Sequence, residues 1–238
     1  MIHNKITGLL IISLFLFVLS GCRKDNVVEG PTIKQPVNIV LDTAYKVFKL
    51  ADFETGVFPS TLTAGIETFG TYKILKDTTD QNINYYFSLV NSVNVTWDWY
   101  LGELRVDAVK FGNTDSIFHF KKLANMDSLN VSNTYLNFNL GGYSDITPNS
   151  SVLVQVITKN PSNAFTYSIN LKWTGWKNIS IPFDAFADAT NATMSNIKNI
   201  KGIHFTFLFQ KGKNTNKTPL SMLLDNIVVT QNKVYQFN

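Results

Sequence analysis

Aromatic side chains and amides are the residues of this chain whose types best suit ligand binding. Trp97 and Trp99 stand at alternate positions of one extended run, with Tyr100 next to them, so the two indoles share a strand face. An aromatic ring offers an apolar plane for the C–H face of a sugar, whose hydroxyls need polar partners. Further rings and polar partners for such a face are Trp173, Tyr143, Asn137, Asn139, Arg105, Gln155 and His204. Tryptophans at this spacing are also typical of a buried strand face.

Catalytic motifs are missing from the sequence. Outside the first 21 residues the histidines are His119 and His204, and neither belongs to an HExxH motif or accompanies a nucleophile elbow. The single cysteine excludes an intrachain disulfide. No spacing selects a pair for glycoside hydrolysis among the carboxylates Glu54, Glu67, Glu103, Asp98, Asp107 and Asp145. We therefore expect that the protein is not an enzyme. A glycoside hydrolase or lyase is an alternative that ranks behind the two non-catalytic interpretations given below.

Alternating hydrophobicity indicates the strands that must position these residues. Every second residue from Ile203 to Phe209 is apolar, which is typical of a strand with one buried face. In the last such run Asp225 shares a face with Leu223 and Ile227. A carboxylate on an otherwise apolar face must be paired, hydrogen-bonded or bound to a metal, because an isolated buried charge is too costly.

Short strands separated by turn residues are expected along the whole domain. They are predicted at 45–50, 72–75, 84–90, 95–101, 104–111, 116–120, 134–140, 152–158, 165–171, 176–183, 202–210 and 223–231. The run 104–111 is alternatively helical, and 191–200 has room for one short helical turn. The pattern predicts an all-β protein, an antiparallel β-sandwich formed by a single domain over residues 41–238.

The N-terminus has the features of a bacterial lipoprotein signal. Lys5 precedes the apolar run 6–19, which is too short to span a bilayer comfortably. The sequence Leu-Ser-Gly-Cys that ends at Cys22 resembles the lipobox, which implies cleavage before Cys22 and its acylation. We expect a helical signal peptide at 1–21 and a flexible tether at 22–40, which contains two prolines. An uncleaved membrane anchor is the other interpretation.

The charge of the mature chain is mild and mixed in sign. Removing Lys5 leaves 21 − 1 = 20 basic residues against 17 acidic ones, a net charge of +3. No run of lysine and arginine exceeds two residues, so nucleic-acid binding is not indicated.

Four short motifs give the chain a family resemblance. They are Phe53-Glu54, the segment 176–183 (WKNISIPF), the segment 203–207 (IHFTF) and the segment 224–227 (LDNI). In this order they resemble galactose-binding-like jelly rolls, which include carbohydrate-binding modules and surface lipoproteins of Bacteroidetes. The resemblance implies a jelly-roll sandwich and a structural calcium ion held by Glu54 and Asp225, with Asp52 as a third ligand. It also implies that Trp176 packs in the core. Alternation places Trp176 on the other side from Ile179 and Ile181, and a bulge at Gly175 would turn it inward.

These observations together predict a lipid-anchored, non-catalytic glycan-binding protein of the cell envelope. We expect it at the outer membrane, on the cell surface or the periplasmic face, with a polysaccharide or oligosaccharide as ligand. Calcium is the only cofactor expected, and neighbouring outer-membrane proteins are candidate partners. The main alternative is a structural lipoprotein whose sandwich binds another protein.

Overall fold

The computed structural model describes residues 47–66, 70–79, 82–91, 102–120, 129–143, 150–159, 164–209 and 220–232. All of them belong to one compact unit that spans residues 33–238. The described residues form strands and short 3-10 helices, and no helix among them is long and apolar enough to cross a membrane. The predicted signal peptide, Cys22 and the tether lie outside the described residues.

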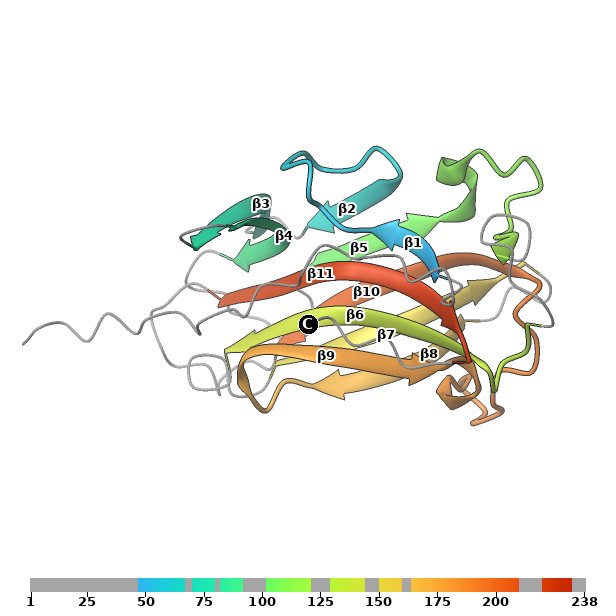
Figure 1. Cartoon of the computed structure of the whole chain (residues 1–238). Coiled ribbons are helices and arrows are strands. Elements are labelled where there is room, and N and C mark those ends of the chain that lie inside the picture. The colour runs from blue at the N-terminus through green and yellow to red at the C-terminus, as the bar shows by residue number, and fades with distance from the viewer. Residues whose placement is uncertain are drawn as a thin grey trace, which may run out of the picture. The chain divides into compact units, whose positions relative to one another are not determined.

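Two antiparallel sheets form the sandwich, which confirms the predicted all-β fold class (Figure 1). Sheet A has the order β3 (Gly70–Thr79), β4 (Asn82–Asn91), β11 (Leu220–Gln231), β6 (Thr134–Tyr143) and β9 (Thr174–Pro182), and β1 (Val47–Ala51) also pairs with β11. Sheet B has the order β2 (Leu62–Ile66), β5 (Gly102–Asp107), β10 (Ile200–Phe209), β7 (Ser150–Thr158) and β8 (Ala164–Asn170). The 3-10 helices are η1 (Ala108–Phe111) and η2 (Phe183–Ala185).

The strand order is of the jelly-roll type. The late strand β11 lies between β4 and β6, and β10 lies between β5 and β7, so neighbours in space are distant in sequence. In Figure 1 the strands β11, β6 and β9 lie in front of β10, β7 and β8. The last third of the chain therefore supplies a central strand to each sheet.

Phenylalanine rings from the inner faces of both sheets form the core. Phe138 of β6 meets Phe205 of β10 edge-on, with ring centroids 5.1 Å apart. Phe87 of β4 stacks with Phe207 of β10 at 6.3 Å. All four side chains are fully buried. Each such burial is worth about 1.5–3 kcal/mol, so the period-2 pattern of the sequence is what holds the sheets together.

The structure differs from the predicted strands in three places. Residues 116–119 form a loop and Phe120 is helical, instead of the predicted strand, because Phe118 and Phe120 leave the sheets and pack against Phe48 of β1. The predicted strand 104–111 ends at Asp107 and continues as η1. Strand β2 was not predicted, since its sequence LTAGI lacks a clear alternation. The predicted strand 95–101 lies outside the described residues.

Candidate functional site

The outer face of sheet A carries a row of amides and hydroxyls. Phe138 and Leu140 point into the core and are fully buried, so Asn137 and Asn139 between and beside them point outward. The register of β6 with β9 places Asn139 opposite Asn178. Asn137 lies opposite Ser180 on the same face. The polar stripe that alternation predicts on β6 is therefore continued across β9.

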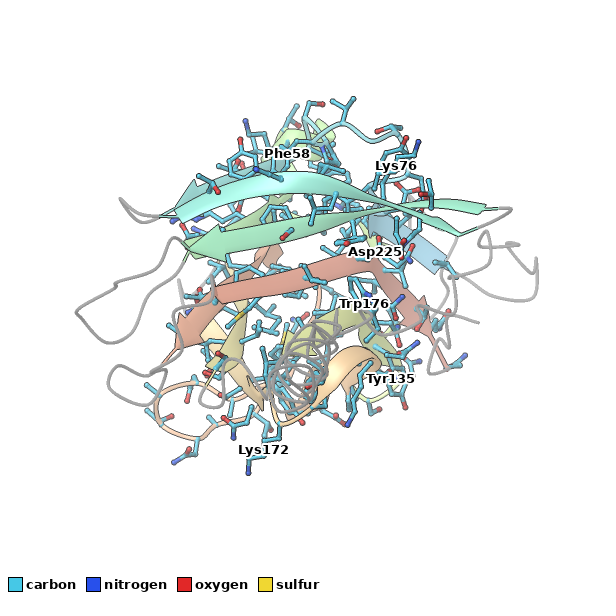
Figure 2. All side chains as sticks on the ribbon, turned by 90° about the vertical axis from the view of Figure 1, so that its left-hand side faces the viewer. Phe58, Lys76, Tyr135, Lys172, Trp176 and Asp225 are labelled. Atoms are coloured by element: carbon cyan, nitrogen blue, oxygen red, sulfur yellow. The ribbon has the colours of Figure 1, made fainter. Side chains whose placement is uncertain are left out.

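Two aromatic side chains meet above this face. The rings of Trp176, from β9, and Tyr86, from β4, have centroids 5.3 Å apart and planes at 79°. Strands β6 and β11 lie between β9 and β4 in the sheet, so the two side chains reach toward each other across them. Figure 2 shows Asp225, Trp176 and Tyr135 on one side of sheet A. Sequence reasoning missed Tyr86 as a site residue, although alternation with Phe87 places it outward.

The prediction that Trp176 packs in the core is wrong. The β6–β9 ladder runs without a shift from Gly142 opposite Gly175 to Gly141 opposite Trp176. Gly175 has a left-handed φ of 92° but introduces no bulge, so alternation keeps the indole on the outer face. The side chain is half-buried, and its indole N–H is buried without an acceptor in the part of the chain that the structure describes.

Trp173 lies apart from the amide row, in the connection between β8 and β9. It is half-buried against the core, and the Lys177 ammonium lies 4.8 Å from its ring centroid. The indole N–H of Trp173 is also buried without an acceptor among the described residues. Trp97, Trp99 and Tyr100 lie outside the described residues, as does the side chain of Tyr143. The predicted tryptophan pair therefore stays a prediction.

Asn137 is tied into the sheet by its own hydrogen bonds. Its amide nitrogen donates to the Thr230 hydroxyl at 2.9 Å and to the Tyr135 carbonyl at 3.3 Å. Its amide oxygen accepts a hydrogen bond from the Ser180 hydroxyl at 2.7 Å. The side chain is fully buried. In this arrangement Asn137 holds β6, β9 and β11 in register, whereas the half-buried Asn139 and the exposed Asn178 lie closer to solvent.

Arg105, predicted as a partner of the same ligand, lies on the opposite side of the sandwich. Its neighbours Leu104 and Val106 on β5 are fully buried, so Arg105 points away from the core on the outer face of sheet B. There it forms an ion pair with Glu103. Register places His204 opposite Arg105. The polar residues predicted to form one site are thus divided between two faces.

A histidine–carboxylate pair accompanies Arg105 on sheet B. The imidazole Nε2 of His204 lies 3.0 Å from the Asp107 carboxylate. This hydrogen bond lowers the pKa of Asp107. Partial burial raises the pKa, but charge interactions with His204, Arg105 and Lys201 lower it further, so the net shift is downward. The carboxylates of β5 that a hydrolase interpretation would need are therefore engaged in pairs on this face.

Four charged side chains interact electrostatically where β1 ends beside β11, and we call them the Lys49 cluster: Lys49, Asp52, Glu54 and Asp225. The Lys49 ammonium forms an ion pair with Asp52. Asp225 is 1% exposed. Burial raises the pKa of Asp225 well above its ordinary range, the charge of Glu54 raises it further, and Lys49 offsets this only in part.

The donors around Asp225 show how its charge is accommodated. Its Oδ1 accepts a hydrogen bond from the Asn226 backbone N–H at 2.8 Å. Its Oδ2 accepts from the Asn226 side chain at 3.1 Å and from Asn84 at 3.5 Å. Asn226 has a left-handed φ of 52°, at the point where the β11–β6 register shifts. The irregularity in β11 thus supplies the donors that a buried carboxylate requires.

The predicted calcium ligands Glu54 and Asp225 do lie close enough to act on each other electrostatically. Their oxygens and excess negative charge fit a hard cation such as calcium. Glu54 and Asp225 are the residues that would hold it, and the ion would supply charge neutralisation. Within the described ranges, however, no three His, Cys, Asp or Glu side chains gather in a metal-holding group. The positive charge beside the carboxylates in this structure is the Lys49 ammonium.

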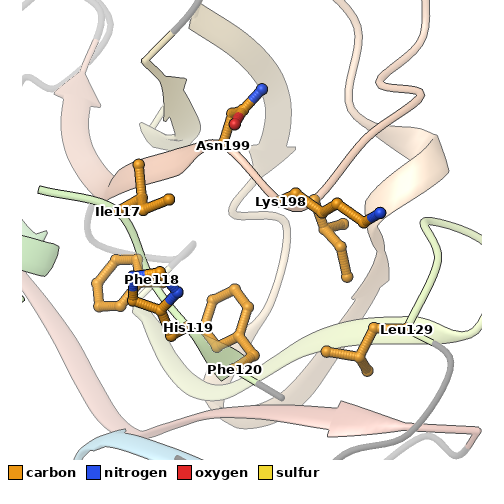
Figure 3. Close-up of a pocket in the computed structure, with 8 residues that line it drawn as sticks. Ile117, Phe118, His119, Phe120, Leu129, Lys198 and Asn199 are labelled. Carbon is orange, nitrogen blue, oxygen red and sulfur yellow. The ribbon is translucent and has the colours of Figure 1, made fainter. Parts of the chain in front are cut away.

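A cavity of about 540 Å³ lies away from both outer faces, between the 117–120 loop and residues 197–199. Its lining includes Phe118, Phe120 and Leu129. In Figure 3 the Asn199 amide and the Lys198 ammonium point away from the two phenyl rings. His119 at its edge is 2.8 Å from the carboxylate of Asp115. The described lining residues do not bring polar groups together inside this cavity, so the outer face of sheet A is the better candidate site.

No protein-family model and no curated protein sequence matches the chain. Solved structures resemble it at low identity. A family 11 carbohydrate-binding module of a cellulosomal cellulase from Clostridium thermocellum is 14% identical over 81% of this chain and 98% of the module, with a TM-score of 0.46. SGBP-B from a complex xyloglucan utilization locus in Bacteroides uniformis is 12% identical over 77% of this chain and 49% of that one, also with a TM-score of 0.46.

An exo-beta-agarase structure is 13% identical over 78% of this chain, with a TM-score of 0.49. The matched region covers 25% of the agarase, so this chain corresponds to about a quarter of that protein. All three TM-scores are below 0.5. The case for a function therefore rests on the residues of this chain.

Proposed function

We propose that the protein is a non-catalytic glycan-binding protein that uses the outer face of sheet A, with Trp176 as its aromatic contact. The observation that carries the proposal is the position of Trp176. Its half-buried indole stands beside the amides of Asn139 and Asn178 on a sheet face that points away from the core. An apolar ring next to amide groups is the combination that a sugar requires.

The unpaired indole N–H adds a second reason. A buried donor without an acceptor costs about 1–3 kcal/mol. Because this nitrogen is buried, a sugar hydroxyl reaches it only when a side chain that covers it moves aside, and the new hydrogen bond would then recover part of that cost. Tyr86 would hold the indole through its edge-to-face contact, which limits the side-chain entropy lost on binding.

The charge of the face indicates a neutral glycan. The outward residues of the described parts of β6 and β9 near Trp176 are uncharged, namely Tyr135, Asn137, Asn139, Thr174, Asn178 and Ser180. The cation that the described register places on this face, Lys49, is already paired with Asp52, so an acidic sugar would be desolvated there without a free cationic partner, which is costly. We therefore propose a neutral polysaccharide or oligosaccharide as the ligand.

The lipid anchor at Cys22 completes the proposal, with support from the sequence alone. A chain held at the outer membrane through this cysteine would present the sandwich to a polysaccharide at the cell surface or in the periplasm. A single acyl chain binds membranes only marginally, so stable anchoring requires more than one chain on the modified cysteine. Neighbouring outer-membrane proteins are the proposed recipients of the bound glycan.

Affinity electrophoresis of the full chain through gels that contain one polysaccharide each tests this function. The gels contain mixed-linkage glucan, xyloglucan, mannan or the acidic polygalacturonate. We expect retardation by at least one neutral polymer and none by polygalacturonate. Trp176→Ala is expected to weaken binding by at least about tenfold, the loss of one stacking contact worth roughly 1.4 kcal/mol.

Tyr72→Ala is the matched control, because Tyr72 is an exposed aromatic residue on the edge strand β3. It should bind as the unmodified chain does. Both variants must melt cooperatively for the comparison to count. Failure of every neutral glycan to bind a well-folded chain would contradict the proposal and favour the protein-binding lipoprotein.

A further inference from the structure

The cavity between the 117–120 loop and residues 197–199 has an apolar interior, and we call it the Phe118 cavity. Its volume is about 540 Å³, and its described apolar lining residues are Ile117, Phe118, Phe120, Leu129 and Ile197. Phe118 and Phe120 are 2% exposed and form the inner wall, whereas Leu129 is half-buried. Cavities of this size with a mostly apolar lining are typical of small-molecule sites.

The inner wall of the Phe118 cavity is held in place by contacts of its own. The rings of Phe118 and Phe120 are nearly parallel, with centroids 5.3 Å apart. Phe48 of β1 meets both rings edge-on, at 6.2 and 5.2 Å. The backbone N–H of Phe118 donates to the Ile200 carbonyl at 2.7 Å, which ties the loop to the start of β10. Side chains that are already ordered lose little conformational entropy when a ligand binds.

The polar lining residues lie at the mouth of the Phe118 cavity, and one of them is a cation. Figure 3 shows the Lys198 ammonium and the Asn199 amide directed away from the two phenyl rings. His119 is engaged by the Asp115 carboxylate at 2.8 Å, and the Lys159 ammonium donates to the Asp115 carbonyl at 2.6 Å. Among the described residues no carboxylate forms an ion pair with the exposed Lys198. The mouth therefore presents a positive charge that is free to bind an anion.

The size and polarity of the interior limit the class of ligand. Because a water molecule takes up about 30 Å³ of the liquid, 540 Å³ corresponds to roughly 18 non-hydrogen atoms. A sugar ring would bury its hydroxyls there without hydrogen-bond partners, which is costly. An alkyl chain or an aryl ring instead gains about 25 cal/mol for each Å² of apolar surface that leaves water. The interior therefore favours an apolar group.

We propose that the Phe118 cavity binds a small amphiphile, with an alkyl or aryl body against Phe118 and Phe120 and a carboxylate at the Lys198 ammonium. The apolar body leaves water for the inner wall. The carboxylate stays at the mouth, where it accepts a charge-assisted hydrogen bond from Lys198. This inference concerns the Phe118 cavity alone and does not depend on glycan binding at Trp176.

Isothermal titration calorimetry of the full chain with decanoate tests the proposal. We expect a single saturable site for decanoate and no binding of acetate, which lacks the apolar body. Decyltrimethylammonium has the same chain with the opposite charge and should bind at least about tenfold more weakly, because Lys198 repels it.

Lys198→Met keeps an apolar stem of similar length and removes the charge. It should weaken the binding of decanoate by about threefold to fivefold, the effect of losing an exposed ion pair, and leave the binding of neutral 1-decanol unchanged. Lys172→Met is the matched control, because it removes an exposed lysine from the connection between β8 and β9. It should change neither affinity. Equal affinities of Lys198→Met and the unmodified chain for decanoate would overturn the proposal.

Leu129→Trp places a larger side chain in the cavity and should abolish the binding of decanoate and 1-decanol alike. Undiminished binding by a Leu129→Trp chain that melts cooperatively would contradict the proposal. The unmodified chain offers a test that holds even where this variant does not fold. NMR cross-peaks are expected between the decanoate methyl group and the ring protons of Phe118 and Phe120. Cross-peaks to other aromatic rings in their place, or binding that does not saturate, would overturn the assignment of the site.

Discussion

The two outer faces of the sandwich are both polar, but their chemistry differs. On sheet A, Trp176 lies beside the uncharged amides of Asn139 and Asn178. On sheet B, Arg105 forms an ion pair with Glu103, and beside it the His204 imidazole is hydrogen-bonded to the Asp107 carboxylate. The described outward residues of β5, β7 and β10 include no phenylalanine, tyrosine or tryptophan.

The difference separates the area around Trp176, which can bind, from a surface whose charged groups are already paired with each other; elsewhere on sheet A, Asn137 and the Lys49–Asp52 pair are satisfied as well. Charged groups paired with each other on a half-exposed sheet gain little from a ligand, because binding would break existing contacts. An aromatic plane with amides at its side offers unused apolar area. Polar alternation alone therefore does not identify a binding face, and the partners of each polar group must be known.

Among the substitutions that test this contrast, a change at Asn137 is expected to have the largest effect, and that effect is on the stability of the fold. Asn137→Ala removes hydrogen bonds that join β6 to β9 and β11 and deprives the Ser180 hydroxyl of its present acceptor. We expect the free energy of unfolding to fall by about 1–3 kcal/mol. Urea denaturation measures this change. Arg105→Ala on the other face is the control and should cost less than about 1 kcal/mol. Equal losses would contradict the contrast between the faces.

A smaller effect concerns pH and the Asp107–His204 pair. The pKa of Asp107 is lowered in the folded state, so its contribution to stability is present above the ordinary aspartate value of about 3.9. That contribution disappears as the pH falls through the lower folded pKa. Urea denaturation from about pH 2 to about pH 5, a range that spans the ordinary value, should show less acid destabilisation in Asp107→Asn than in the unmodified chain. An unchanged pH dependence would show that this pair is unimportant for stability.

Alternation in the sequence predicts much of the fold and part of the site. The inward series of Phe205 and Phe207 is confirmed, and so is the outward direction of Asn139. Alternation also placed Trp176 outward, but the expected bulge at Gly175 led to the wrong prediction. A glycine permits a bulge without requiring one, and only the register decides.

Other features of the site could not be predicted because they depend on tertiary pairing. Alternation places Arg105 and Asn137 on the outer sides of their strands without telling which sheet each strand joins. The contact of Lys49 with Asp52 requires the left-handed backbone of Phe53, which no local propensity indicates. The meeting of Trp176 with Tyr86 spans two intervening strands.

The most direct test of the binding face is the NMR signal of the Trp176 indole N–H during titration with an oligosaccharide of the polymer that binds. A Trp176→Phe variant assigns the signal among those of the four tryptophans. We expect this signal and the backbone amides of β6 and β9 to shift in proportion to saturation, while β5 and β10 do not respond. Saturable binding that leaves the Trp176 signal in place and shifts β5 and β10 would contradict the account.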